Sequence, residues 1–271
     1  MTFRPTLLLA LALAGTGPRL AAHDYWFEPE RLVAAPDETV VVRLLVGEKL
    51  QAEEERSFEL ARIKRLELAG PKGRRDVSGE FTEGAKPFGA VRLDTPGWHV
   101  LAMERAASSI TLEADKFDEY LKEEGLEHVI GEREKLGESR QPGRERYRRF
   151  LKAFLWAGGP AGDPMPGVIL RLDLTPVLAA GRMPATGDEA AVRVAFDNAP
   201  LAGAAVFATV RDAAGKVHAQ KLTTGADGVA HFRLTQAGMW VVRLVHMRRA
   251  PAGDAGADWE SFWAACTFGV K

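Results

Sequence analysis

The chain has 271 residues, a hydrophobic content of 46% and a formal net charge of −1, which are values typical of a folded globular protein of one large or two ordinary domains. Loss of residues 1–22, which contain Arg4 and Arg19, would shift that charge to about −3. Such a near-neutral chain lacks the basic surplus of nucleic-acid-binding proteins and of proteins attracted to anionic lipid, and we expect no nucleic-acid partner.

The first 22 residues have the pattern of a secretory signal peptide. Arg4 supplies the positive start, residues 7–14 (LLLALALA) form a short apolar segment, and residues 20–22 (LAA) form a small-residue cleavage site. The apolar segment is much shorter than the roughly 20 residues that span a bilayer. We therefore expect cleavage after Ala22, export to the periplasm and no stable membrane insertion of the mature protein, with an uncleaved N-terminal anchor as the alternative.

Residues 23–112 carry the pattern of an antiparallel β-sandwich. β-Branched and apolar runs at 38–48, 63–68, 90–93 and 98–103 are separated by Gly and Pro, which mark turns between strands. We expect these runs to form an N-terminal β region.

Residues 113–160 are predicted to form a helical insert. Phe117, Tyr120 and Leu121 repeat at helical spacing before Gly125, a typical helix stop. The stretch 143–157 (GRERYRRFLKAFLWA) places apolar residues at i, i+3, i+4, i+7 and i+8 with basic residues between them. This pattern predicts an amphipathic helix packed on a sheet, with a helix at a membrane surface as the alternative.

Residues 161–187 are expected to contain a strand at 168–175 and a linker, and residues 188–271 return to a β pattern. Apolar runs such as EAAVRVAF and MWVVRLVH alternate with turn signals, which is typical of a small antiparallel sandwich. The single cysteine, Cys266, lies in an apolar run, which predicts a buried strand residue and excludes an internal disulfide. The predicted fold is mainly β, with two antiparallel β-sandwich-like regions and the helical insert between them.

The start "AHDYWFEP", the stretch "VHMRR" and the end "DWESFW" resemble a bacterial periplasmic family, domain of unknown function 4198. The likeness extends over nearly the whole mature chain. Members of this family have been described as nickel-uptake-associated, and the resemblance implies an immunoglobulin-like or transthyretin-like C-terminal sandwich of the carboxypeptidase-regulatory type.

His23 would become the first residue after cleavage, and its α-amine and ring nitrogen can then chelate one metal ion. A third nitrogen from His246 would complete a nitrogen-rich site, which favours Cu or Ni. His246 follows Val242 and Leu244 on one face of a predicted strand, so it extends an apolar row and needs a partner. The two histidines can share an ion only if they lie within roughly 8 Å of each other.

Carboxylates can hold a ligating ring in place through its second nitrogen, and the candidates for that role are Asp258, Glu260 and Asp24. His99 is a lower-ranked alternative ligand, and is otherwise expected to be a surface histidine on a strand. A further alternative is that His246 only binds a carboxylate or a carbonyl and that His23 is simply the first residue.

The sequence thus predicts an exported periplasmic protein that binds Cu or Ni as a carrier, or as an accessory to metal uptake, with the metal ion or an uptake-system component as its partner. The alternative is a non-catalytic β-sandwich module that binds a protein, peptide or glycan without metal. No H-E-x-x-H, G-x-S-x-G, P-loop or G-x-G-x-x-G motif is found, so no enzyme is predicted.

Overall fold

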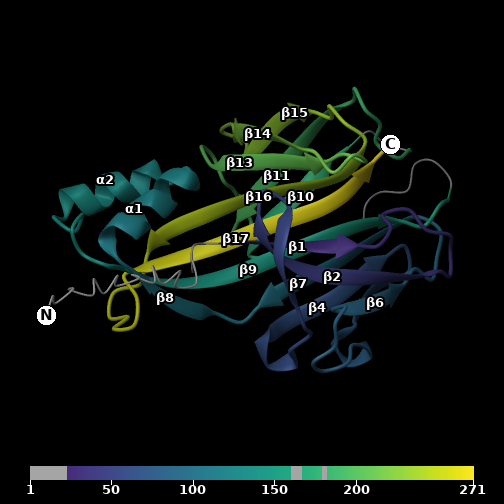
Figure 1. Ribbon diagram of the computed structural model, residues 1–271, viewed down its shortest axis with the longest axis horizontal. Helices are drawn as coiled ribbons and strands as arrows, with labels where there is room; N and C mark the ends of the chain where they lie inside the picture. Colours follow the sequence, from purple (N-terminus) through teal and green to yellow (C-terminus); the bar gives the residue numbers. More distant parts are fainter. Residues whose placement is uncertain (1–22, 160–166, 179–181) are drawn as a thin grey trace, which may run out of the picture.

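The computed structural model describes residues 23–159, 167–178 and 182–271. The predicted signal peptide, residues 1–22, and parts of the predicted 161–187 segment lie outside these residues. The described chain forms three β layers, in which a long central sheet carries a smaller sheet on each face (Figure 1). The prediction of a mainly β, sandwich-like fold is confirmed.

The central sheet has nine strands, in the order β14-β13-β16-β17-β9-β7-β4-β5, with β8 beside β9. Its longest strands are β9, β16 and β17; β9 lies far from the other two in the sequence and pairs with β17 in parallel. The strands are β4 (Ile63–Gly70), β5 (Gly73–Asp76), β7 (Trp98–Arg105), β8 (Ser108–Leu112), β9 (Gly143–Trp156), β13 (Ala205–Arg211), β14 (Val217–Thr223), β16 (Gly238–Arg249) and β17 (Trp259–Val270).

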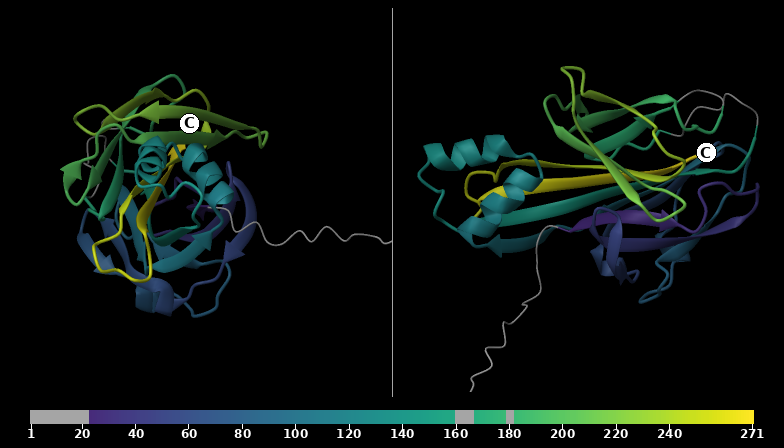
Figure 2. Two further views of the ribbon diagram at one scale, coloured as in Figure 1. Left: turned by 90° about the vertical axis from the view of Figure 1, so that its left-hand side faces the viewer. Right: turned by 45° about the horizontal axis from the view of Figure 1, so that its top comes forward.

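Two outer sheets cover opposite faces of the central sheet (Figure 2). The N-terminal sheet contains β1 (Asp24–Pro29), β2 (Thr39–Glu48), β3 (Gln51–Arg56) and β6 (Gly89–Arg92). The C-terminal sheet contains β10 (Leu172–Val177), β11 (Glu189–Phe196), β12 (Ala199–Pro200) and β15 (Val229–Arg233).

The side chains of the central strands alternate between the two cores. In β16, Val242 and Leu244 pack toward the C-terminal sheet, whereas Val241 packs toward the N-terminal sheet. In β9, Phe150 and Phe154 face the C-terminal sheet, whereas Leu151 and Leu155 face the N-terminal sheet. This alternation is the period of two of a strand buried on both faces.

The prediction of a helix at 143–157 is wrong, because this stretch forms β9. A strand that is covered on both faces is apolar at nearly every position, so an apolar run within it also satisfies helical spacing. The basic residues of β9 do not share one solvated face, since Arg149 and Lys152 are buried whereas Arg144 is exposed.

Two short helices follow β8, α1 (Ala114–Glu123) and α2 (Glu127–Lys135), and single 3₁₀ turns lie at Leu60–Arg62 and Ser78–Glu80. The prediction of a helix that ends at Gly125 is confirmed, and Gly125 has a φ of 70°. The helices pack at one end of the long strands, where Phe117 and Leu121 meet Val245 and Trp263 (Figure 1). Among the described residues, neither helix has the length and apolar character needed to cross a membrane.

Candidate metal centre

His23 lies just before β1, at the edge of the N-terminal sheet. Strand β1 runs antiparallel to β2, with Asp24 opposite Gly47. Strands β2 and β3 are joined by a tight turn in which Lys49 and Leu50 have φ values of 49° and 59°. Two positive φ values are the signature of the hairpin turns that match strand twist. This hairpin carries Glu48 and Glu53 to the side of His23.

Gly47 makes this hairpin possible. The β2–β3 register shifts between Val46 and Gly47, and a Cβ atom on Gly47 would lie 1.9 Å from the Gln51 carbonyl oxygen. No side chain fits in that space, so the bulge requires glycine. The bulge thereby sets where Glu48 lies relative to the start of β1.

His23, Glu48 and Glu53 each offer one ligand atom, and these three atoms lie within 4.8 Å of one another. The His23 Nδ1 atom is 3.5 Å from Glu53 Oε2. Two donors bound to one transition-metal ion at about 2.0–2.2 Å each are at most about 4.4 Å apart. Since the Glu53 side chain is 55% exposed, a small movement of it satisfies that limit. The group therefore fits a metal ion that accepts one imidazole and two carboxylates.

A buried cluster of charges anchors the chain directly after His23. Arg243 Nε of β16 lies 2.8 Å from Asp24 Oδ2, and the same guanidinium binds Glu124 at the end of α1. Burial raises the pKa of Asp24 to about 7, although Arg243 opposes that shift. Asp24 therefore ties β1 to the central sheet and does not contact His246.

His246 lies on the other side of the central sheet from His23. Its ring packs 4.5 Å from the Phe196 ring of β11 and 6.1 Å from the Phe262 ring. The group of possible ligand atoms that contains His23 includes Glu48 and Glu53 but, among the described residues, not His246. The structure therefore does not bring His23 and His246 together, and a shared metal site does not fit this fold.

The other candidate residues are engaged elsewhere. Asp258 forms an ion pair with Arg144 at 2.6 Å, and Glu260 forms one with Arg248 at 3.0 Å. His99 is 1% exposed, and its Nδ1 lies 3.3 Å from the Gly97 carbonyl oxygen, so the expectation of a surface histidine is wrong. The prediction that Cys266 is buried is confirmed, and burial raises the pKa of its thiol to about 12.

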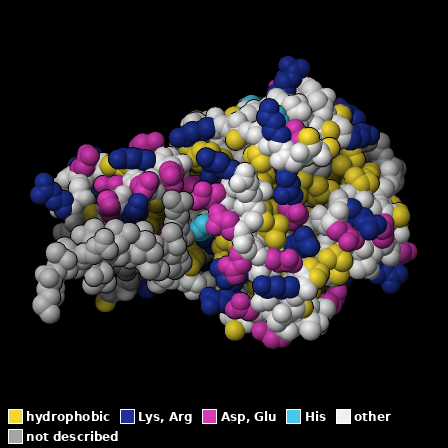
Figure 3. Space-filling model, viewed as in Figure 1, with side chains coloured by type: hydrophobic (Ala, Val, Ile, Leu, Met, Phe, Trp, Pro, Cys, Tyr) yellow, Lys and Arg dark blue, Asp and Glu magenta, His cyan; other side chains and the backbone are white. Residues whose placement is uncertain are grey.

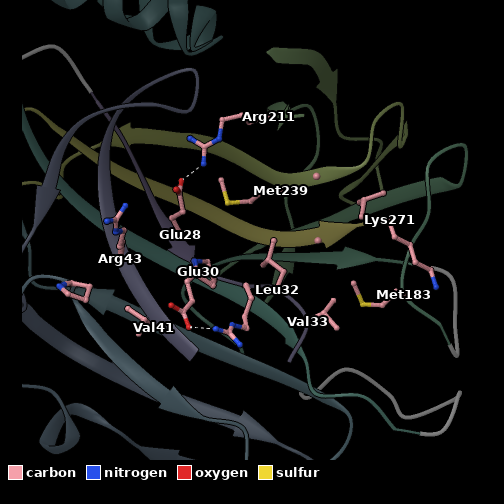
Figure 4. A pocket seen from close by; sticks show the side chains of 16 residues that line it. Glu28, Glu30, Leu32, Val33, Val41, Arg43, Met183, Arg211, Met239 and Lys271 are labelled. Atoms are coloured by element: carbon pink, nitrogen blue, oxygen red, sulfur yellow. Dashed lines mark hydrogen bonds and ion pairs between the residues drawn. The ribbon is translucent and has the colours of Figure 1, made fainter. Parts of the chain in front are cut away.

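A hollow of about 730 Å³ lies between the end of β1 and the central sheet (Figure 4). Leu32, Met183 and Met239 line it. Two charged pairs stand at its rim, since Arg211 lies 2.7 Å from Glu28 and Arg31 lies 3.1 Å from Glu30. These two pairs compensate each other's charge, Arg43 and Lys271 add two cations to the lining, and most of the other lining residues are apolar. On the face seen in Figure 3, acidic and basic side chains are likewise interspersed.

Comparison with known proteins places this chain in a family. A family model described as domain of unknown function (DUF4198) matches residues 20–248. The chain belongs to the DUF4198 family. No curated protein matches this DUF4198 chain. One solved structure, described as a tetra-tandem repeat in the extending region of a large adhesion protein, matches at 12% identity with a TM-score of 0.22. That match covers 91% of the DUF4198 chain, which spans about half, 49%, of the adhesion-protein chain.

Sequence reasoning missed Glu48 and Glu53 as companions of His23. The hairpin that brings them there has Lys49-Leu50 at its turn, where Asn-Gly or Asp-Gly would be the usual signal. A glycine before the turn and the acidic stretch at 53–55 after it were the available signals.

Proposed function

We propose that this DUF4198 chain is an exported protein that binds a transition-metal ion, Cu or Ni, at His23, Glu48 and Glu53. The observation that supports the proposal most is the convergence of three ligand atoms from two adjacent segments within 4.8 Å. His23 Nδ1 is the atom that faces Glu53, and it is also the ring nitrogen that forms a chelate with the α-amine of the same residue. Cleavage after Ala22 would free that amine.

Imidazole and amine nitrogens give Cu(II) and Ni(II) an advantage over the hard cations Mg²⁺ and Ca²⁺, which prefer oxygen ligands only. The site lies at an edge of the N-terminal sheet, and Glu48 and Glu53 are exposed. An exposed site can exchange its ion with a partner, which suits a periplasmic carrier or an accessory to a metal-uptake system. The proposal includes nickel as one of the two candidate ions and a transthyretin-like fold for the C-terminal sandwich.

The carboxylate ligands provide a direct test. We would titrate Ni(II) and Cu(II) into protein that begins at His23 and compare the Glu53→Gln variant by calorimetry. Loss of one charged ligand should weaken binding by about tenfold or more. Glu54→Gln is the matched control, because Glu54 lies on the same strand and binds Arg56 at 2.9 Å instead. Equal affinity in Glu53→Gln and wild-type protein would contradict the proposal.

The α-amine is tested separately by one extra alanine before His23. This addition leaves the ring and both carboxylates in place and removes only the chelating amine. Affinity for Cu(II) should fall by about tenfold or more, and the one-to-one stoichiometry should persist. Unchanged affinity would remove the amine from the site and leave a three-ligand centre.

A second candidate function, a binding module that works without metal, is supported by the hollow beside Met183 and Met239 (Figure 4). Concave, mainly apolar surfaces with a polar rim are typical ligand sites. Under this alternative, a Met239→Arg variant would lose its ligand while Glu53→Gln would keep it.

A further inference from the structure

A second pocket, of about 420 Å³, opens between β1, the end of β7 and the start of β9. Three arginines, several hydroxyl groups and one carboxylate, that of Glu59, line it, in contrast to the hollow near Met239. Its lining includes Tyr25, Arg62, Arg105, Ser108, Tyr147 and Arg149.

Arg149 is a buried cation held by aromatic rings. Its side chain is 8% exposed, and its guanidinium carbon lies 4.0 Å from the Tyr25 ring centre, 4.7 Å from that of Trp263 and 5.4 Å from that of Tyr147. Among the described residues, no carboxylate oxygen forms an ion pair with it. Buried arginines are ordinarily paired, because an isolated charge is costly to remove from water.

Arg105 faces the same pocket in a similar state. Its guanidinium carbon also lies over the Tyr25 ring, 5.4 Å from the ring centre. Its Nη1 atom is buried and has no hydrogen-bond partner among the described residues. Burial lowers the pKa of both guanidiniums, and each also repels the other.

Two carboxylates whose charges act on this pair of arginines, Glu59 on Arg105 and Asp24 on Arg149, already bind other arginines. Glu59 Oε2 accepts a hydrogen bond from Arg62 Nε at 2.8 Å, and Asp24 is bound by Arg243 at 2.8 Å. The pocket therefore combines a buried guanidinium, that of Arg149, with a half-buried one, that of Arg105, and among the described residues neither forms an ion pair. Burial of a guanidinium without a counter-ion is unfavourable, and such groups are found where a bound ligand supplies the negative charge.

We propose that this pocket binds a small organic molecule through an oxyanion group, a phosphate or a carboxylate, that lies between Arg105 and Arg149. Guanidinium groups bind such anions through two parallel N–H donors. Tyr25, Tyr147 and Ser108 add hydroxyl donors to the wall. The volume leaves room for a body larger than the anion itself and falls in the usual range for small-molecule sites, about 300–1,000 Å³.

Calorimetry on the protein that begins at His23, in the presence of a chelator that removes metal ions, tests the proposal. The probes are inorganic phosphate, glucose 6-phosphate and citrate. They distinguish a site for phosphate groups from a site for carboxylates. Trp263 fluorescence provides a second readout, because its ring contacts Arg149. At least one probe should bind one-to-one with a dissociation constant below about 1 mM.

Arg105→Gln and Arg149→Lys should each weaken that binding by about tenfold or more. The matched control is Arg193→Gln, on the exposed face of β11, which should leave affinity within about twofold. Circular dichroism shows which variants are folded. If Arg149→Lys does not fold, Arg105→Gln alone provides the test. Absence of saturable binding by all three probes, or equal affinity in wild type and Arg105→Gln, would overturn the proposal. Neither result depends on whether His23 binds metal.

Discussion

Arg243 Nε lies 2.8 Å from Asp24 Oδ2, and this contact joins the first strand of the N-terminal sheet to the central sheet. Arg243 projects from β16 on the face opposite to Leu244 and His246. The anchor after His23 is therefore on one face of β16, and the imidazole of His246 is on the other. The two histidines therefore lie on opposite faces of the central sheet.

Arg243→Met should destabilise the protein by about 3 kcal/mol or more, because it leaves Asp24 and Glu124 buried without their shared cation. Chemical unfolding measures the change. Arg92→Met is the control, since the Arg92–Asp37 pair is exposed on both sides and should contribute less than about 1 kcal/mol. A loss no larger than that of the control would show that the two acids do not depend on Arg243.

Lys152 is a buried lysine in the middle of β9. Its Nζ lies 2.6 Å from Asp173 Oδ2, and the Lys152 side chain is 3% exposed. Lys152→Met should lower the free energy of unfolding by about 3–5 kcal/mol, since it leaves the buried Asp173 carboxylate without its cation. The double variant Lys152→Met, Asp173→Asn should recover most of that loss, because the amide that replaces the carboxylate carries no charge. Additive losses in the double variant would contradict this interpretation.

His246 should make stability depend on acid pH. Burial first, then the charges of His128 and Arg248, lower its pKa from 6.5 to about 4, and Asp197 only partly opposes them. The unfolded chain takes up the proton more readily, so a stability contribution that is complete above pH 6.5 is lost as the pH falls toward 4.

The His246→Phe variant has no proton to take up and keeps the ring contacts with Phe196 and Phe262. Its unfolding free energy relative to wild type should rise by about 2 kcal/mol between about pH 7.5 and about pH 4.5. His231→Phe, at an exposed position of β15, is the matched control. A difference for His246→Phe that stays constant with pH would contradict the burial argument.

Local pattern predicted most of the strands, because their apolar runs are bounded by Gly and Pro. The strands β2, β7 and β16 lie where alternation and turn signals put them. The pattern failed at β9, because this strand is covered on both faces and its basic residues Arg149 and Lys152 are buried, so the strand has no solvated polar face that would show a period of two. Parallel pairing of β9 with β17 also has no local signal.

The candidate site was predictable in part. His23 was identified by its place after the expected cleavage site, which is a property of the sequence alone. Its neighbours depend on the register of β1 on β2 and on a hairpin turn built from Lys49 and Leu50, neither of which the sequence marks. Conversely, His246 looked available because its strand ends soon after it, whereas the C-terminal sheet covers it with Phe196.

The most direct test of the metal proposal compares two histidine variants in one Cu(II) titration, on protein that begins at His23. We expect His23→Ala to weaken binding by about a hundredfold, because the ring nitrogen is lost, and His246→Phe to bind as wild type does. Loss of binding in His246→Phe, or full affinity in His23→Ala, would contradict a metal centre at His23, Glu48 and Glu53.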